Sequence, residues 1–180
     1  MDSHPHDELL DFVDENDTVI GQMHRSEVYA RHLSNVRVIN AFVINSHGQL
    51  WIPRRTAHKR SYPLCLDMSV GGHVESGEAY EEMFRRELRE ELNLDAAAVN
   101  PRLLGYLTPR DGISAFMKVW EIRQDEPPQY NPDDFIEYFW LTPQEFFARL
   151  QNGDKSKDDL PPLIERFYGK PSPLAQERDE

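Results

Sequence analysis

Three acidic side chains, Glu87, Glu90 and Glu91, are spaced three and four residues apart in the segment 78–92. In a helix, residues at these spacings project from one face. Like charges so close together destabilise a helix unless something neutralises them, and clustered carboxylate oxygens suit Mg²⁺ or Mn²⁺ rather than zinc. The alternative is a solvated acidic face that needs no metal, because three arginines lie beside it: Arg85, Arg86 and Arg89.

The segment 78–92 is predicted to be an amphipathic helix. It contains no glycine or proline, and Met83 widens an apolar stripe that recurs every four residues. A stripe of this kind is typical of a helix that packs one face on a core. The stripe consists of Tyr80, Phe84, Leu88 and Leu92.

The acidic helix follows a glycine pair and a short loop, and together they form a longer pattern. From Gly72 the chain reads glycine, five residues, Glu78, seven residues, Arg-Glu-Leu, one residue, Glu-Glu, one residue, Asn-Leu. This segment, 72–94, resembles the Nudix box, the loop–helix–loop motif of the Nudix hydrolase superfamily. Nudix proteins usually have glycine where this chain has Asn93, and asparagine is the best substitute in a left-handed helix terminus.

The resemblance implies the metal ligands. In Nudix enzymes the glutamates of the Arg-Glu-x-x-Glu-Glu run ligate one or more divalent ions, and here these are Glu87, Glu90 and Glu91. The carbonyl of Gly72 is implied as a further ligand, because glycine lets the backbone approach closely. The implied cofactor is Mg²⁺, or Mn²⁺ in its place.

The resemblance also implies the catalytic residues. Glu87 or its neighbour Glu90 is implied as the general base, and Arg86 as the residue that orients a glutamate by pairing with Glu78. A bound cation bridges phosphate oxygens and reverses the local negative field, so that a carboxylate nearby can take the proton of an attacking water.

The activity that the resemblance implies is Mg²⁺-dependent hydrolysis of a phosphoanhydride in a nucleoside di- or triphosphate, or in a related small diphosphate compound. Two alternatives stay open: an activity like that of isopentenyl-diphosphate isomerase, and a non-catalytic nucleotide-binding module. Such modules frequently lose glutamates of the box. Glu78, Glu87, Glu90 and Glu91 are all present here, which favours an enzyme.

Two further segments resemble the Nudix branch related to isopentenyl-diphosphate isomerase. One is Gly-Gln-Leu at 48–50 followed by Ile-Pro-Arg-Arg, and the other is Trp-Leu-Thr-Pro at 140–143. Arg54 and Arg55 could bind substrate phosphate from their strand end, or form a surface pair with acidic neighbours. The isomerases carry a catalytic cysteine where this chain has Gly71, and Cys65 is expected to pack as a small apolar residue.

The sequence says less about the identity of the group that is joined to the diphosphate in the substrate than about the reaction. An additional carboxylate from outside the box could come from Asp133, Asp134 or Glu137. His73 resembles a metal ligand of the isomerases in position, and the alternative is a structural or solvent-facing histidine. Four strand aromatics could stack on a base or pack in the core: Tyr106, Phe116, Trp120 and Phe139.

The remaining elements predict a mixed β-sheet flanked by helices. The resemblance implies that this is the α/β Nudix fold, with the sheet sandwiched between helices in α/β/α order. We expect one domain over 9–168, an acidic flexible leader at 1–8 and a disordered tail at 169–180. The segment 163–168 and the segment after Thr142 are predicted helices. Strands are predicted at 9–13, 18–22, 35–45, 50–54, 66–70, 102–108, 113–122 and 135–141.

Composition and net charge restrict the classes of partner that the protein is expected to bind. The chain has 20 basic and 32 acidic residues, a net charge of −12, which argues against binding nucleic acid polymers or anionic membranes through a basic surface. A single cysteine excludes an internal disulfide and a cysteine-built zinc site. The N-terminus has no signal-peptide pattern and no apolar run reaches the length of a membrane span, so a cytoplasmic protein is expected. The oligomeric state stays open.

Overall fold

The structure is a computed structural model in which residues 7–169 of the 180 are described. The predicted leader and tail lie almost entirely outside these residues. Asp7 and Glu8, the described end of the leader, both contact helix α1 (Arg25–Ala30). Asp7 accepts hydrogen bonds from the backbone N and the Oγ of Ser26, and Glu8 forms an ion pair with Arg25.

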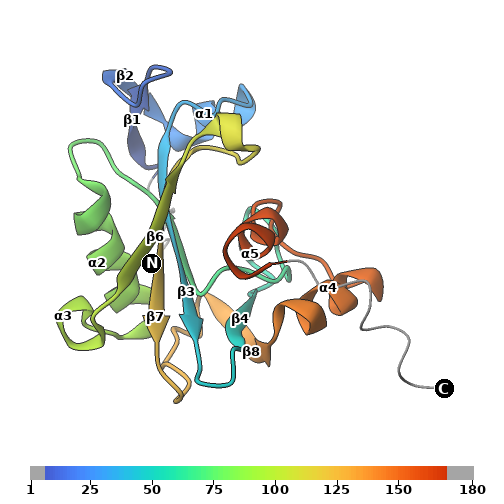
Figure 1. Ribbon diagram of the computed structural model, residues 1–180. Coiled ribbons are helices and arrows are strands. Elements are labelled where there is room, and N and C mark those ends of the chain that lie inside the picture. The colour runs from blue at the N-terminus through green and yellow to red at the C-terminus, as the bar shows by residue number, and fades with distance from the viewer. Residues whose placement is uncertain (1–6, 170–180) are drawn as a thin grey trace, which may run out of the picture.

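The centre of the molecule is a six-stranded mixed sheet (Figure 1). Strand β3 pairs in parallel with β7, while its other edge pairs antiparallel first with β5 and then with β4. This mixture of directions confirms the predicted sheet. Its main path is β6 (Arg102–Leu107), β7 (Phe116–Arg123), β3 (Arg37–Ile44), β4 (Leu50–Arg55) and β8 (Phe135–Leu141), with β5 (Val70–His73) beside β3.

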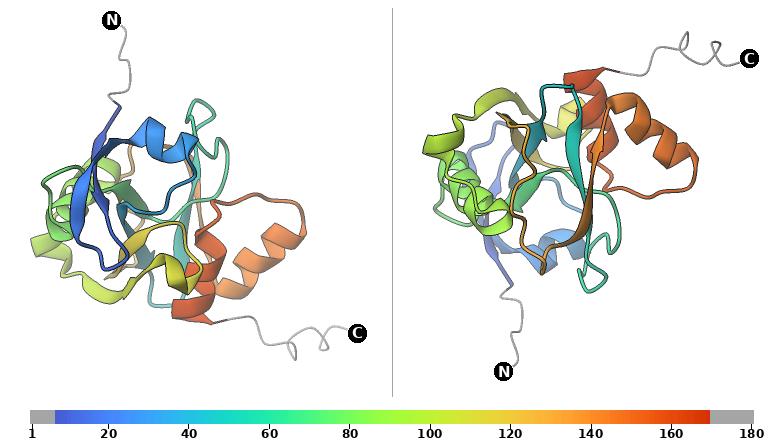
Figure 2. Two further views of the ribbon diagram at one scale, coloured as in Figure 1. Left: turned by 90° about the horizontal axis from the view of Figure 1, so that it is seen from above. Right: turned by 90° about the horizontal axis from the view of Figure 1, so that it is seen from below.

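Helices cover both faces of the sheet, as the alternating side chains of β3 require. Ile39, Ala41 and Val43 belong to the core shared with α2 (Tyr80–Leu92). Val38 and Phe42 belong to the opposite core, which includes residues of α4 (Pro143–Gln151) and α5 (Leu160–Tyr168). Figure 2 shows α2 on one side of the sheet and α4 and α5 on the other. The α/β/α arrangement is therefore confirmed.

Strand β5 lies later in the chain than the sequence indicated. We expected a strand over 66–70 that ended at the glycine pair, but the pair lies inside β5. A Cβ on Gly71 would lie 2.8 Å from Oδ1 of Asn40, so glycine lets this strand run close to its neighbour. Leu66 instead makes isolated bridges, to Arg54 and to Ser156.

Helix boundaries show smaller differences. Helix α2 begins at Tyr80, so Glu78 lies in the turn before it rather than at its first position. Asn93 ends the helix with φ of 53°, the left-handed conformation expected of it. Helix α5 begins at Leu160, three residues before the predicted start, because prolines are well accommodated in a first helical turn. Thr142 caps α4 as predicted.

A hairpin and two short helices lie outside the main sheet. Strand β1 (Leu9–Val13) pairs antiparallel with β2 (Val19–His24), which confirms the predicted hairpin. Helices α1 and α3 (Ala96–Val99) were not predicted, since helices of six and four residues are too short to show a repeating stripe. Within the described residues, no helix has the length and apolar character needed to cross a membrane.

Helix α2 is anchored by its apolar stripe. Leu88 is fully buried, and the Phe84 ring stacks on Trp120 of β7 with centroids 4.4 Å apart. We expect Leu88→Ala to lower the free energy of unfolding by about 2–5 kcal/mol, the usual cost of a buried leucine cavity. Urea denaturation measures this loss. Arg85→Ala, on the exposed side of the same helix, should stay within about 0.5 kcal/mol of the wild type, and equal effects would contradict the assigned orientation.

Candidate active site

Strand β5 approaches α2 at a distance that only glycine allows. A Cβ on Gly72 would lie 2.6 Å from Cε of Met83 and 3.0 Å from Cγ of Glu87. Two residues that the sequence predicted to act together, Gly72 and Glu87, are thus in direct contact. The amide of Gly71 also donates a hydrogen bond to Oε2 of Glu91, at 3.0 Å.

Two carboxyl groups on this face of α2 have raised pKa values. Burial, and then the charge of Glu90, raises the pKa of Glu87 to about 7, although the guanidinium of Arg86 opposes the shift. Burial and the charge of Glu87 raise the pKa of Glu91 well above its ordinary value, with the Gly71 amide acting against them. The protein alone therefore disfavours the charged forms of Glu87 and Glu91, and a bound cation would favour them.

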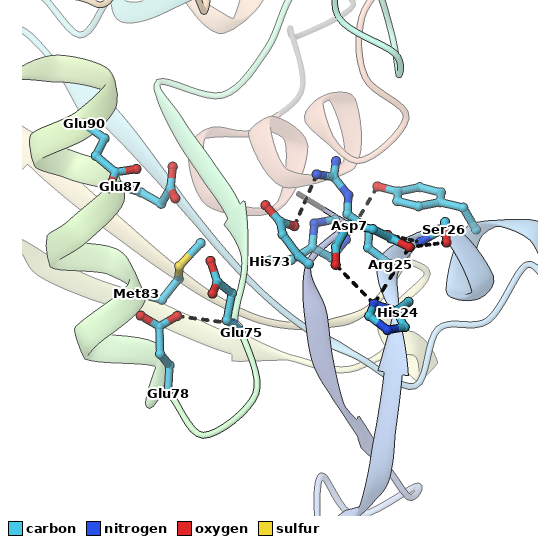
Figure 3. A network of polar contacts seen from close by, with 12 residues as sticks. Asp7, His24, Arg25, Ser26, His73, Glu75, Glu78, Met83, Glu87 and Glu90 are labelled. Carbon is cyan, nitrogen blue, oxygen red and sulfur yellow. Dashed lines mark hydrogen bonds and ion pairs between the residues drawn. The ribbon is translucent and has the colours of Figure 1, made fainter. Parts of the chain in front are cut away.

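Arg86 connects the helix to the loop before it. Its Nε donates to Oε1 of Glu78 at 3.1 Å, and its Nη2 donates to Glu75 and to Glu78, both at 3.0 Å. The predicted pairing with Glu78 is present, while Glu75 was not foreseen. Nη1 of Arg86 lies 3.6 Å from Glu87 and 3.9 Å from Glu90, so the same guanidinium also faces the carboxylate cluster. Figure 3 shows Glu75 and Glu78 beside α2, below Glu87 and Glu90.

The β1–β2 hairpin holds the same loop from outside. Asp11, buried on β1, accepts a hydrogen bond from Oγ of Ser76 at 2.7 Å and another from the amide of Gly77 at 3.2 Å. The amide of Ser76 donates to the carbonyl of Leu9. These contacts fix the loop that presents Glu75 to Arg86, and so they act indirectly on the cluster.

A cavity of about 590 Å³ opens beside the cluster. Gly72 and the three glutamates of α2 line one side of it, and other segments contribute cations. Arg55 reaches the cavity from the end of β4 and donates to Asp67 at 2.6 Å. Its predicted companion Arg54 does not line the cavity. The cations of the cavity wall are Arg25, Arg55, Lys59 and Lys157.

The comparisons with known proteins agree with this geometry. The NUDIX domain family matches residues 34–164. An uncharacterised Nudix hydrolase of Nostoc sp. (strain PCC 7120) is 60% identical over 162 residues, 89% of this chain and 96% of the relative. A Nudix hydrolase of Deinococcus radiodurans is 49% identical over 90% of this chain and 95% of that protein.

The chain belongs to the Nudix hydrolase family. Enzymes of this family act on phosphoanhydride-containing small molecules and generally use divalent cations. A crystal structure of a Deinococcus radiodurans protein superposes with a TM-score of 0.85 at 49% identity, covering 89% of this chain and 99% of that one. An isopentenyl-diphosphate isomerase of Kocuria rhizophila, 26% identical over 81% of this chain and 83% of its own, fits the resemblance to that branch.

Several candidates outside the Nudix box lie away from the cavity. Arg54 is held by Glu137 at 2.5 Å and by Asp154 at 2.7 Å, the surface-pair alternative for this residue. Of the three additional carboxylates considered, only Asp134 lines the cavity, where it pairs with Lys59. None of the four strand aromatics lines it. Phe116 and Trp120 are buried, Tyr106 donates to Asp17, and Phe139 packs beside two arginines.

His73 lies on the cavity wall directly after Gly72. Burial, helped by the charges of Arg25 and Lys157, lowers the pKa of His73 to about 3, so the imidazole is neutral at physiological pH. Cys65 is buried and does not line the cavity, and burial raises the pKa of its thiol. The position that carries the thiol in the isomerases is occupied by Gly71.

The donor set suits a divalent cation. Within residues 7–169, no three carboxylate or imidazole groups already converge as a closed cation site. Glu87 and Glu91 nevertheless lie one helical turn apart beside the glycine pair, and the Glu90 side chain is 58% exposed, which leaves it room to turn toward them. Carboxylate and carbonyl oxygens are the ligands that Mg²⁺ prefers.

The close approach at Gly72 gives a direct test. We expect Gly72→Ala to push Glu87 away from β5 and lower kcat/KM by about 100-fold, because displacements near 1 Å cost about that much. Steady-state kinetics measures the loss. Gly21→Ala is the matched control, since nothing lies within 4 Å of a Cβ there and its activity should be unchanged. Full activity in Gly72→Ala would show that the contact does not position Glu87.

Proposed function

We propose that this Nudix hydrolase is Mg²⁺-dependent and cleaves a phosphoanhydride in a nucleoside di- or triphosphate, or in a related small diphosphate compound. The observation that carries the proposal is the lining of the cavity. It includes Gly72 and the three carboxylates of α2, and it also includes the cations Arg25 and Lys157. Such a site suits a polyanion bound together with a cation.

The chain's own residues divide the work as follows. Glu87, Glu90, Glu91 and the carbonyl of Gly72 would hold the cation, which supplies charge neutralisation at the phosphate oxygens when bound. Glu87 or Glu90 would accept the proton of the attacking water, since Glu90 is open to solvent and Glu87 lines the cavity. Phosphoryl transfer depends mainly on positioning and charge neutralisation, so few other groups are needed.

Two arginines have different parts in the proposal. Arg86 would orient Glu87 and Glu90 while its hydrogen bonds to Glu75 and Glu78 keep it in place. Its hydrogen bonding to Glu78, and then the negative charges of Glu78, Glu75 and Glu87, raise the pKa of Arg86 further and keep it charged. Arg55 is the arginine proposed to contact substrate phosphate, and the ion pairs of Arg54 assign it to holding strand β4 against β8 and the segment at Asp154.

The proposed cellular location rests on the state of the cysteine. The one cysteine of the chain, Cys65, is free and buried, which is in keeping with a reducing compartment. We therefore place the enzyme in the cytoplasm, where Mg²⁺ and nucleotides are its proposed partners.

The proposal is tested by phosphate release from nucleoside diphosphates, nucleoside triphosphates, sugar nucleotides and dinucleotides, with and without Mg²⁺. We expect turnover only with a divalent cation and a loss of about 100-fold or more in Glu87→Gln, because the amide is a poorer ligand and no base. Glu126→Gln, an exposed glutamate remote from the described cavity lining, is the control and should keep wild-type rates.

Other outcomes decide against the proposal. Turnover that persists in Glu87→Gln, or that ignores divalent cations, contradicts the assigned roles. Isomerisation of isopentenyl diphosphate without nucleotide hydrolysis would support the isomerase alternative. A folded protein that binds nucleotides and hydrolyses none would support the binding-module alternative.

A further inference from the structure

Two tyrosines line the cavity away from the carboxylate cluster. Tyr29 comes from helix α1 and Tyr62 from the loop between β4 and β5. Apart from His73, they are the aromatic side chains among the described lining residues. Tyr29 is 46% exposed although it faces a hollow of the molecule. We call these two residues the tyrosine rim.

Tyr62 is half-buried and is held in place by its backbone and its hydroxyl. Its backbone has φ of 51°, in the left-handed region that residues with a side chain rarely adopt, and its carbonyl accepts from the amide of Cys65. Its hydroxyl donates to Asp158 at 2.5 Å. Across residues 7–169, no other aromatic ring and no guanidinium or ammonium group stacks on Tyr62.

Tyr29 is connected to the carboxylate cluster through one residue. Its ring lies edge-to-face against His73 with centroids 5.7 Å apart, and its hydroxyl is 3.5 Å from Nε2 of that histidine. His73 directly follows Gly72, which touches Glu87. Figure 3 shows His73 between Glu87 on one side and Arg25 on the other. Tyr29 is thus linked to the cluster through His73 and Gly72, and Tyr62 lines the same cavity.

Cations lie beside the tyrosine rim, where the guanidinium carbon of Arg25 is 5.4 Å from the centroid of the Tyr29 ring. Arg25 and Lys157 act on His73 from this part of the cavity. Arg25 contacts Glu8 at 3.3 Å, and Lys157 lies 3.4 Å from Asp67, so each retains N–H donors for a further anion. The cavity wall thus combines oxygen ligands for a cation, positive charge and aromatic surface, and it also carries the carboxylates Glu8, Asp134, Asp158 and Asp159. A nucleotide bound together with a cation presents groups that match the first three.

We propose that the tyrosine rim binds the nucleobase of the substrate, so that the aromatic base is required for affinity and the variable group is a nucleoside. This proposal rests on the proposed function of the same cavity and specifies its substrate class. Stacking on tyrosine tolerates different bases because every base has a π-face. We therefore expect the rim to distinguish nucleotides from non-aromatic diphosphates rather than one base from another.

The test compares the equilibrium binding of nucleoside 5′-monophosphates and of ribose 5-phosphate by calorimetry, with Mg²⁺ present. Neither ligand contains a phosphoanhydride, so turnover does not interfere. We expect wild-type protein to bind the nucleotides at least about tenfold more tightly than ribose 5-phosphate. Tyr29→Ala and Tyr62→Ala should each weaken nucleotide binding by about 5- to 100-fold and leave ribose 5-phosphate binding unchanged.

Matched variants separate stacking from folding. Tyr29→Phe and Tyr62→Phe keep the rings and should keep the preference for nucleotides. Tyr106→Ala removes a tyrosine of similar exposure, 43%, that does not line the cavity, and it should bind like the wild type. Circular dichroism checks that each variant is folded. Tyr29 is at the exposed rim, so its variant is informative even if Tyr62→Ala fails to fold.

Equal affinity for nucleotides and ribose 5-phosphate overturns the proposal, as does a preference that survives in both alanine variants. Nucleotide binding too weak to measure at millimolar concentration overturns it as well. The two proposals fail differently. If the hydrolase proposal is wrong, nucleotide preference persists without any Glu87-dependent turnover. If the rim proposal is wrong, Glu87-dependent hydrolysis persists on substrates with and without an aromatic base.

Discussion

The constraint on which the site depends is the placement of like charges on a helix face that packs against a strand. Glu87 and Glu91 lie one turn apart on α2, and Gly71 and Gly72 bring the β5 backbone against them. Burial removes the water that would screen the charges, which is why the pKa of both carboxyls rises. Only a helix anchored as firmly as α2 can keep them together, and its fully buried Leu88 provides that anchor.

The surrounding elements offset the repulsion between these carboxylates. Arg86 contributes one guanidinium to the cluster and is itself fixed by Glu75 and Glu78. Asp11, on a hairpin that lies outside residues 34–164, fixes the loop that carries Glu75. The two carboxylates that bind Arg86 thus hold its guanidinium beside the three carboxylates of α2, which remain available to a cation. The hairpin therefore contacts the loop of the candidate site even though the family match begins after it.

Sequence reasoning was most successful where chemistry and spacing coincide. The trio on α2, the Arg86–Glu78 pair and the left-handed Asn93 follow from helical periodicity and from the Nudix box, since these depend on residues close together in the chain. The lining of the rest of the cavity depends on long-range packing. Arg54 and Arg55 are neighbours in sequence, yet alternation along β4 sends one to Asp154 and the other to the cavity. Tyr29 lies on a helix too short to be predicted, and strand aromatics such as Trp120 proved to be core residues.

The central claim, that the α2 carboxylates form a cation site, is tested most directly by the free energy of unfolding as a function of Mg²⁺ concentration. A cation that binds only the folded state stabilises it by about 2.7 kcal/mol at 100 times its Kd. We predict such a rise for the wild type and for Glu126→Gln, and little or none for Glu87→Gln. The same rise in Glu87→Gln as in the wild type would contradict the account.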